Sequence, residues 1–350
     1  MQSRVRLLTQ LPSNGLYEGF VALPNGALLV ARADAPELYR IDVGADGADE
    51  VQLLSTFQEA PGINGIINIC GIPGHDDEFI VLVGLIDLQA VRVSNYQIWR
   101  FSMSTTTGHD DGAKWKRVVA LNGSGFYLSM VTISERVLLV TDSARYRVYS
   151  VDLVTGSTEV LVTHASFKAA TPADFFGINR LSLGEGGLIW FTNSSQHLLG
   201  RFCVESPAAA AAAAADKEGA PSTATARLVG DVEIVAKGLP ACDGFAVFPD
   251  GSAAFLVTMH EGKLVRLDLA GGRGESISDV GLALVNPSAV GLIPPGPGPG
   301  AEDGGGGLQL CVICNGEFEV TWKDHDPNAG WQDIADIVDR VTVTVMVTEE

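Results

Sequence analysis

A hairpin of two apolar strands recurs six times along the chain, and this repeat constrains the fold more than any other feature. Each copy is an apolar strand, a polar turn and a second strand that ends near an Asp or a Gly. A period of about fifty residues is typical of propellers and other repeat architectures. The copies begin near residues 27, 78, 136, 187, 252 and 307.

A further short apolar segment precedes each hairpin, and more strands, such as KRVVAL and TEVLV, lie between the units. Amphipathic helical periodicity is almost absent, which disfavours a parallel α/β fold. Four strands in each of six units predict an all-β fold: a single six-bladed β-propeller over residues 1–350, with four-stranded antiparallel blades around a central channel. The six predicted first strands are YEGFVAL, INGIINI, LSMVTI, INRLSL, CDGFAVF and PSAVGLI.

Closure of such a ring requires the two chain ends to share a blade. The segment SRVRLLTQLP (3–12) resembles the fourth strands and is predicted to complete blade six. The alternating segment RVTVTVMVTEE (340–350) is a competing or additional edge strand, and the sequence does not decide between them. A low-complexity segment at 206–226 and a Pro/Gly segment at 294–307 are predicted surface loops.

The charge of the chain excludes several classes of partner. It has 23 basic and 42 acidic residues and a formal net charge of −19, which repels nucleic-acid phosphates and anionic membranes. We find no apolar stretch long enough for a signal peptide or a membrane span. We therefore expect a cytoplasmic protein without nucleic-acid partners or membrane insertion. The five cysteines are scattered and odd in number, as in reduced proteins.

Motifs for common cofactors and nucleophiles are missing. The sequence has no P-loop, no dinucleotide-binding fingerprint, no H-E-x-x-H and no G-x-S-x-G. Cys311 and Cys314 form a C-x-x-C, but at odd spacing on a strand they point to opposite faces, which disfavours a zinc pair.

One polar residue occupies the same place at the start of each predicted first strand. In a propeller such positions converge around the axis, and two carboxylates with two amides suit a hard cation such as calcium. The alternative is a water-filled channel with a polar lining. Glu18 raises the sharpest question, because a carboxylate entering a core needs a cation or hydrogen-bond donors nearby. The six candidate catalytic residues are Glu18, Asn64, Ser129, Asn179, Asp243 and Ser288.

Aromatic residues flank this ring of polar positions. Those on the loop side are predicted to wall an apolar substrate pocket over the ring. They are Tyr17, Phe126, Tyr127 and Phe176.

The segments YEGFVALPNG, FGINRLSLGEGGLIWFTNS and LPACDGFAVFPDGSA resemble the senescence marker protein and gluconolactonase family of six-bladed propellers. The resemblance implies a divalent metal, calcium or zinc, held by Glu18, Asn179 and Asp243, and a metal-dependent lactonase activity. A further channel asparagine of that family falls on Ser129 here, and this departure weakens the lactonase interpretation.

The segments LPNGALLVARADAPELYRID and VLLVTDSARYRVYSVDLVTG look like a fungal branch of these propellers. Members of that branch include hetero-Diels-Alderases of secondary metabolism, which join a tropolone-derived quinone methide to a terpene alkene. The resemblance implies small apolar substrates of polyketide and terpene type and no cofactor. We therefore carry three hypotheses: such a cyclase, which we favour, a metal-dependent lactonase, and a non-enzymatic binding propeller.

Overall fold

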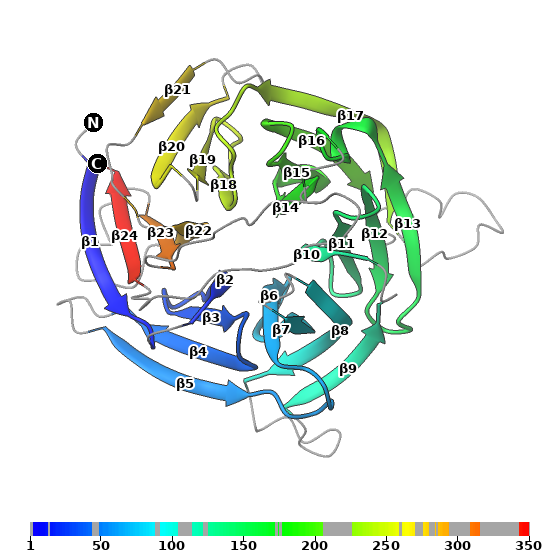
Figure 1. Ribbon diagram of the computed structural model, residues 1–350, viewed down its shortest axis with the longest axis vertical. Coiled ribbons are helices and arrows are strands. Elements are labelled where there is room, and N and C mark those ends of the chain that lie inside the picture. Colours follow the sequence, from blue (N-terminus) through cyan, green and yellow to red (C-terminus); the bar gives the residue numbers. More distant parts are fainter. Residues whose placement is uncertain are drawn as a thin grey trace, which may run out of the picture.

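Strands dominate the computed structural model, which describes residues 3–12, 15–43, 49–87, 92–103, 114–121, 125–171, 174, 177–205, 226–258, 261–269, 276–279, 284, 286–293, 309–315 and 343–349. Within these ranges the strands pair into six four-stranded antiparallel sheets around one axis (Figure 1). The fold is an all-β propeller whose four-stranded blades follow the repeat in the sequence.

Each blade except the last is a meander of four consecutive strands, with the first strand nearest the axis (Figure 1). Blades one to three are β2 (Tyr17–Ala22), β3 (Leu28–Arg32), β4 (Glu37–Asp42) and β5 (Glu50–Thr56); β6 (Gly65–Ile72), β7 (His75–Asp87), β8 (Arg92–Ser102) and β9 (Trp115–Ala120); and β10 (Tyr127–Thr132), β11 (Val137–Asp142), β12 (Arg147–Asp152) and β13 (Thr158–Thr163).

Blades four and five follow the same order, and two short 3₁₀ helices, η1 (Ala165–Phe167) and η2 (Glu185–Gly187), accompany the first and second strands of blade four. The strands of these blades are β14 (Ile178–Leu183), β15 (Leu188–Asn193), β16 (Leu198–Glu205) and β17 (Arg227–Lys237), then β18 (Phe245–Val247), β19 (Ala253–Thr258), β20 (Lys263–Asp268) and β21 (Ser276–Asp279).

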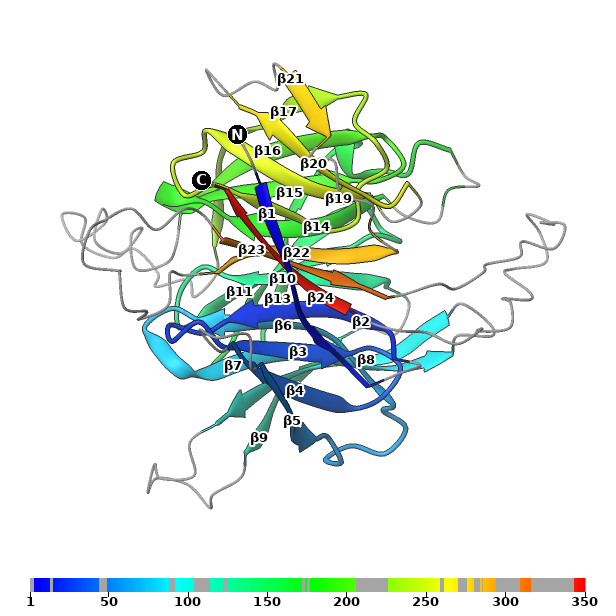
Figure 2. The same cartoon turned by 90° about the vertical axis from the view of Figure 1, so that its left-hand side faces the viewer.

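Blade six joins the two ends of the chain. Its strands run from the axis outward as β22 (Pro287–Ile293), β23 (Gln309–Cys314), β24 (Val343–Glu349) and β1 (Ser3–Gln10). β1 pairs antiparallel with β24, Ser3 opposite Glu349, and the two strands lie side by side in both views (Figures 1 and 2). The two terminal segments therefore do not compete: the C-terminal one is the third strand and the N-terminal one the fourth.

The hydrophobic core lies between neighbouring blades, because each sheet presents alternate side chains to the blade on either side. Cys311 packs with Tyr17 of blade one, whereas Cys314 packs with Phe255 of blade five. The predicted opposite orientation of these two thiols is confirmed. Neither cysteine forms a disulfide bond within the described part of the chain.

A glycine allows blades five and six to approach closely at the axis. A Cβ atom on Gly244 would lie 2.7 Å from Ala289 Cα and 2.8 Å from the Ser288 carbonyl oxygen, both backbone atoms of β22. No side-chain rotation can relieve such a contact. The two first strands can therefore meet at this distance only with glycine at position 244.

We expect Gly244→Ala to lower the free energy of unfolding by about 1–3 kcal/mol, the usual cost of overpacking. Gly71→Ala is the matched control, because a Cβ there meets only Val21 Cγ2 at 3.8 Å. Urea denaturation of both variants measures the difference. Equal effects of the two substitutions would contradict the close approach as the reason for Gly244.

Candidate functional site

Every first strand begins with an irregularity in its pairing to the second strand. In blade one the register passes from Tyr17 opposite Arg32 to Gly19 opposite Ala31, so Glu18 is an extra residue. The same kind of β-bulge recurs in blades two, three, four and six. In blade five two consecutive residues pair with Val257: Asp243 N donates a hydrogen bond to Val257 O, and Val257 N donates one to Gly244 O. Such bulges re-aim side chains and are frequent near active sites.

The bulges correct the sequence alignment of the six polar positions in two blades. Asn64 lies three residues before the bulge of blade two, and Ser129 is the second rather than the first bulge residue of blade three. Apolar side chains take the two equivalent places, so the ring is not polar throughout. The structurally equivalent residues are Glu18, Ile67, Leu128, Asn179, Asp243 and Ser288.

The side chains of three of the six candidate residues form hydrogen bonds with backbone groups and do not join the other three at the axis. The Asn64 amide accepts a hydrogen bond from Ile86 N at 2.6 Å and donates one to Ile86 O at 2.7 Å. Ser129 Oγ accepts from Leu181 N of blade four at 3.0 Å. Ser288 Oγ donates to Tyr17 O of blade one at 2.7 Å. Ser129 and Ser288 thus link neighbouring blades, while Asn64 braces its own.

The other three candidates converge, and the sequence interpretation missed the residue between them. Arg180 Nη2 lies 2.6 Å from Glu18 Oε2 and 3.4 Å from Asp243 Oδ1. Glu18 is on β2 and Arg180 on β14, across the axis from each other (Figure 1). The guanidinium therefore bridges opposite blades. We call Glu18, Asn179, Arg180 and Asp243 the axial ion cluster.

The cluster is largely removed from solvent. The side chain of Arg180 is 9% exposed, that of Asp243 14% and that of Glu18 20%. Burial favours the neutral form of Arg180, but the charges of Asp243 and Glu18 outweigh it and raise the pKa of the guanidinium above its ordinary value. With both carboxylates ionised the cluster carries a formal charge of −1. Arg180 Nε is buried and has no hydrogen-bond partner in the described part of the chain.

Asn179 is held with its amino group toward the cluster. Its Nδ2 donates to Asp243 Oδ1 at 3.2 Å and to Ser194 Oγ at 2.9 Å. Ser194 Oγ in turn donates to Cys242 O at 2.6 Å, which leaves the hydroxyl oxygen as the acceptor for Asn179. Asn179 thus offers Asp243 a donor, as Arg180 does.

The residues implied as metal ligands lie together, but their arrangement does not fit a divalent ion. The Arg180 guanidinium stands between the two carboxylates, and Asn179 presents nitrogen instead of oxygen. Across the described ranges no group of three or more His, Cys, Asp or Glu side chains could hold a metal. The positive charge that Glu18 requires comes from Arg180.

Two of the four aromatic residues predicted to wall a pocket over the axis, Tyr17 and Tyr127, lie in the core instead. Tyr17 is fully buried and packs edge-on against Tyr39, and Tyr127 is 2% exposed and packs edge-on against Tyr96. Both belong to the core between blades, because each sits where its first strand enters the sheet. Phe126 is half-buried just before β10. Phe176 lies outside the described residues.

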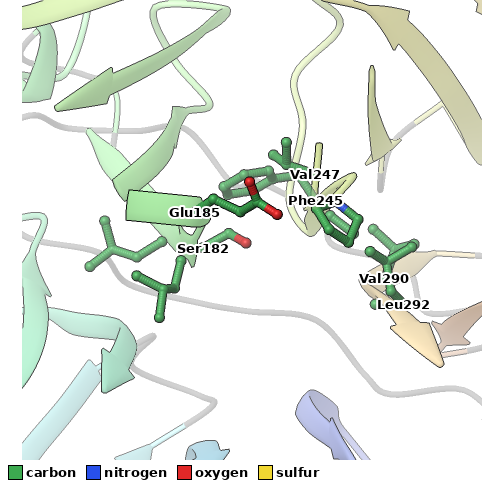
Figure 3. Close-up of a pocket in the computed structure, with 12 residues that line it drawn as sticks. Ser182, Glu185, Phe245, Val247, Val290 and Leu292 are labelled. Atoms are coloured by element: carbon green, nitrogen blue, oxygen red, sulfur yellow. The ribbon is translucent and has the colours of Figure 1, made fainter. Parts of the chain in front are cut away.

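A cavity of about 420 Å³ lies farther along the first strands of blades four, five and six (Figure 3). Leu181 and Phe245 line it, and in the chain they directly follow Arg180 and Gly244. Its polar side chains are Ser182 and Glu185. The lining residues are Leu181, Ser182, Leu183, Gly184, Glu185, Phe245, Ala246, Val247, Pro249, Val290, Gly291 and Leu292.

Fold and site define a β-propeller with a charged cluster on its axis. Several solved structures share the propeller fold. A luciferin-regenerating enzyme has a TM-score of 0.59 and 9% sequence identity, over 98% of this chain and 95% of its own. The calcium-binding protein regucalcin from Agrobacterium tumefaciens has a TM-score of 0.56 and 15% identity, over 99% of this chain and 95% of its own. Virginiamycin B lyase from Staphylococcus aureus has a TM-score of 0.51 and 13% identity, over 99% of this chain and 100% of its own. At these identities the likeness is one of fold.

The sequence matches no family model and no curated protein. In the described part of the structure, none of the helices has the length and apolar character needed to cross a membrane.

Proposed function

We propose that the protein is an enzyme acting on small apolar molecules: a hetero-Diels-Alderase of fungal secondary metabolism that joins a tropolone-type quinone methide to a terpene alkene. The observation that carries the proposal is the buried guanidinium of Arg180, fixed on the axis by Glu18 and Asp243. It places a permanent hydrogen-bond donor group where the resemblance implies a metal. Luciferin-regenerating enzyme and virginiamycin B lyase are propellers named as enzymes, which is consistent with catalysis on this fold.

The proposed reaction needs little from the protein besides positioning and polarisation. The C=C–C=O unit of the quinone methide adds to the C=C of the alkene, so that one C–C and one C–O bond form and three π bonds become one. No proton, electron pair or leaving group departs, and no co-reactant is required. Holding the two partners in contact lowers the entropic part of the barrier.

Arg180 is suited to polarise the carbonyl oxygen of the quinone methide. Electron density grows on this oxygen when the C–C bond forms ahead of the C–O bond, and a fixed donor stabilises it without reorganisation. Arg180 Nε has no acceptor among the described residues, and an unmatched buried donor costs about 1–3 kcal/mol. A substrate oxygen would satisfy it. Glu18 and Asp243 keep the guanidinium in place and charged.

The cavity beside the cluster is suited to the hydrocarbon partner. Leu181, Phe245, Val290 and Leu292 give it apolar walls, and its volume lies within the range of small-molecule pockets. Leu181 directly follows Arg180 on β14, so one strand supplies both the donor and a wall of the cavity.

We expect the purified protein to accelerate formation of the adduct from a tropolone-type quinone methide and a terpene alkene, equally with and without EDTA. Arg180→Lys should lower kcat/KM by about 10²-fold, the loss of one positioned donor, because an ammonium cannot reproduce the planar fork. Arg227→Lys, an exposed arginine of the same blade, is the matched control. Rates equal to the uncatalysed reaction, or activity abolished by chelation, would refute the proposal.

A further inference from the structure

We infer that the guanidinium of Arg180 is the resident cation of the axial site: it excludes divalent metal ions from the native protein, and its removal opens a divalent-cation site made of oxygen ligands. This inference concerns cation binding only. It holds or fails independently of the proposed cyclisation.

Two carboxylates already point at one place. Because Nη2 of Arg180 is 2.6 Å from Glu18 Oε2 and 3.4 Å from Asp243 Oδ1, these two oxygens can be no farther apart than the sum, about 6.0 Å. Two oxygen ligands on opposite sides of a calcium ion are about 5 Å apart. A movement of roughly 1 Å would therefore bring both oxygens to bonding distance.

A third ligand is within reach of the same place. Asn179 Nδ2 lies 3.2 Å from Asp243 Oδ1, and its amide oxygen is on the same planar group. With Arg180 removed, rotation of this amide by half a turn would present oxygen to the cation. Carboxylate and amide oxygens together are ligands that calcium prefers, with water filling the remaining positions.

The charge balance explains why the native protein should exclude the ion. A divalent cation entering between Glu18 and Asp243 would lie against the guanidinium, which is held in its charged form. In a largely buried site this repulsion is poorly screened. Without the guanidinium, the two carboxylates lose the cation that lies 2.6 and 3.4 Å from their oxygens. A divalent ion then brings the cluster to neutrality.

The test compares three proteins by calorimetric titration with CaCl₂ and MnCl₂ at physiological ionic strength, after treatment with chelator. They are the native chain, Arg180→Ala, and the triple variant Glu18→Gln/Arg180→Ala/Asp243→Asn. The triple variant corrects for weak binding to surface acids, which a chain of net charge −19 will show. Arg180→Ala should bind one additional divalent ion, at least 10-fold more tightly than any site of the triple variant.

The native protein should bind no ion beyond those bound by the triple variant, and calcium should raise the Tm of Arg180→Ala alone. A stoichiometric divalent site in the native protein that disappears in Glu18→Gln overturns the inference. So does an Arg180→Ala protein that behaves like the triple variant. If Arg180→Ala does not fold in chelator, refolding with calcium should restore it, and failure to do so counts against the inference. None of these readouts depends on enzymatic activity.

Discussion

Replacing Arg180 with methionine should lower the free energy of unfolding by about 3–5 kcal/mol at pH 7, the usual cost of leaving a buried charge without its partner. Glu18 and Asp243 would then both lose the guanidinium, while Asn179 Nδ2 would still donate to Asp243. Methionine keeps much of the volume of the arginine stem, so packing changes little. Urea denaturation at fixed pH and without divalent ions measures the loss.

The pH dependence of this loss follows from like charges. In Arg180→Met each carboxylate disfavours ionisation of the other, so their pKa values in the folded state rise above those of the unfolded chain. A carboxyl group whose pKa is higher in the folded state than in the unfolded state stabilises the fold at pH values below the unfolded pKa. This stabilisation is lost as the pH rises through the folded pKa. The difference from the native protein should therefore shrink between pH 7 and pH 4.

The matched control removes all three charges. Glu18→Gln/Arg180→Met/Asp243→Asn should recover most of the lost stability, because no charge is left without a partner. A triple variant as unstable as Arg180→Met would mean that lost packing, and not charge, causes the effect. A difference that does not change with pH would point to the same conclusion.

A chain that begins at Leu11 should be less stable by roughly 3.5–10 kcal/mol, because it lacks β1. Seven residues of β1 pair with β24, which corresponds to about one ladder hydrogen bond per pair, and each such bond contributes about 0.5–1.5 kcal/mol net. The loss also exposes β24 as an unpaired edge, which promotes aggregation. Thermal and urea denaturation, with light scattering, measure both effects.

A circular permutant tests whether pairing itself matters. Since Ser3 lies opposite Glu349, residues 3–10 can be moved behind Glu349 and joined to it by a two-residue Asn-Gly turn. This permutant should regain the stability that the truncation loses. A control tests whether the fold tolerates a changed connection between paired strands. In it, residues 206–225 are replaced by a short Gly-Ser linker, because Glu205 and Arg227 pair directly. Failure of the permutant with success of that control would rule out pairing as the cause.

The blades could be predicted because their signal is local. Each is built from consecutive apolar strands, and the spacing of these strands is visible along the chain: all six expected first strands are observed, from Tyr17–Ala22 to Pro287–Ile293. The strand order of blade six, which closes the ring, could not be predicted in the same way. The alternation of 340–350 indicates a strand but does not specify its neighbours. Val343 pairs with Cys314, 29 positions away, and with Gln10, 333 positions away.

The site could be predicted only in part, because a bulge shifts the pattern on which the alignment depends. In blade two the sequence alignment indicated Asn64, whereas the bulge residue is Ile67. The Asn64 side chain forms two hydrogen bonds with the backbone of Ile86 in its own sheet. Arg180 was missed although a lone arginine in the apolar strand INRLSL is a visible signal. Its partner Glu18 is 162 positions away, and no local pattern connects the two.

The closure of blade six also determines when this molecule can finish folding during its synthesis. β1 is made 333 residues before its partner β24, counted from Gln10 to Val343. At 5–20 residues per second, β1 waits on the order of 20 to 70 s for that partner. Throughout this interval the nascent chain carries a strand of unpaired amide and carbonyl groups, and chaperones that shield such strands would be needed most at β1.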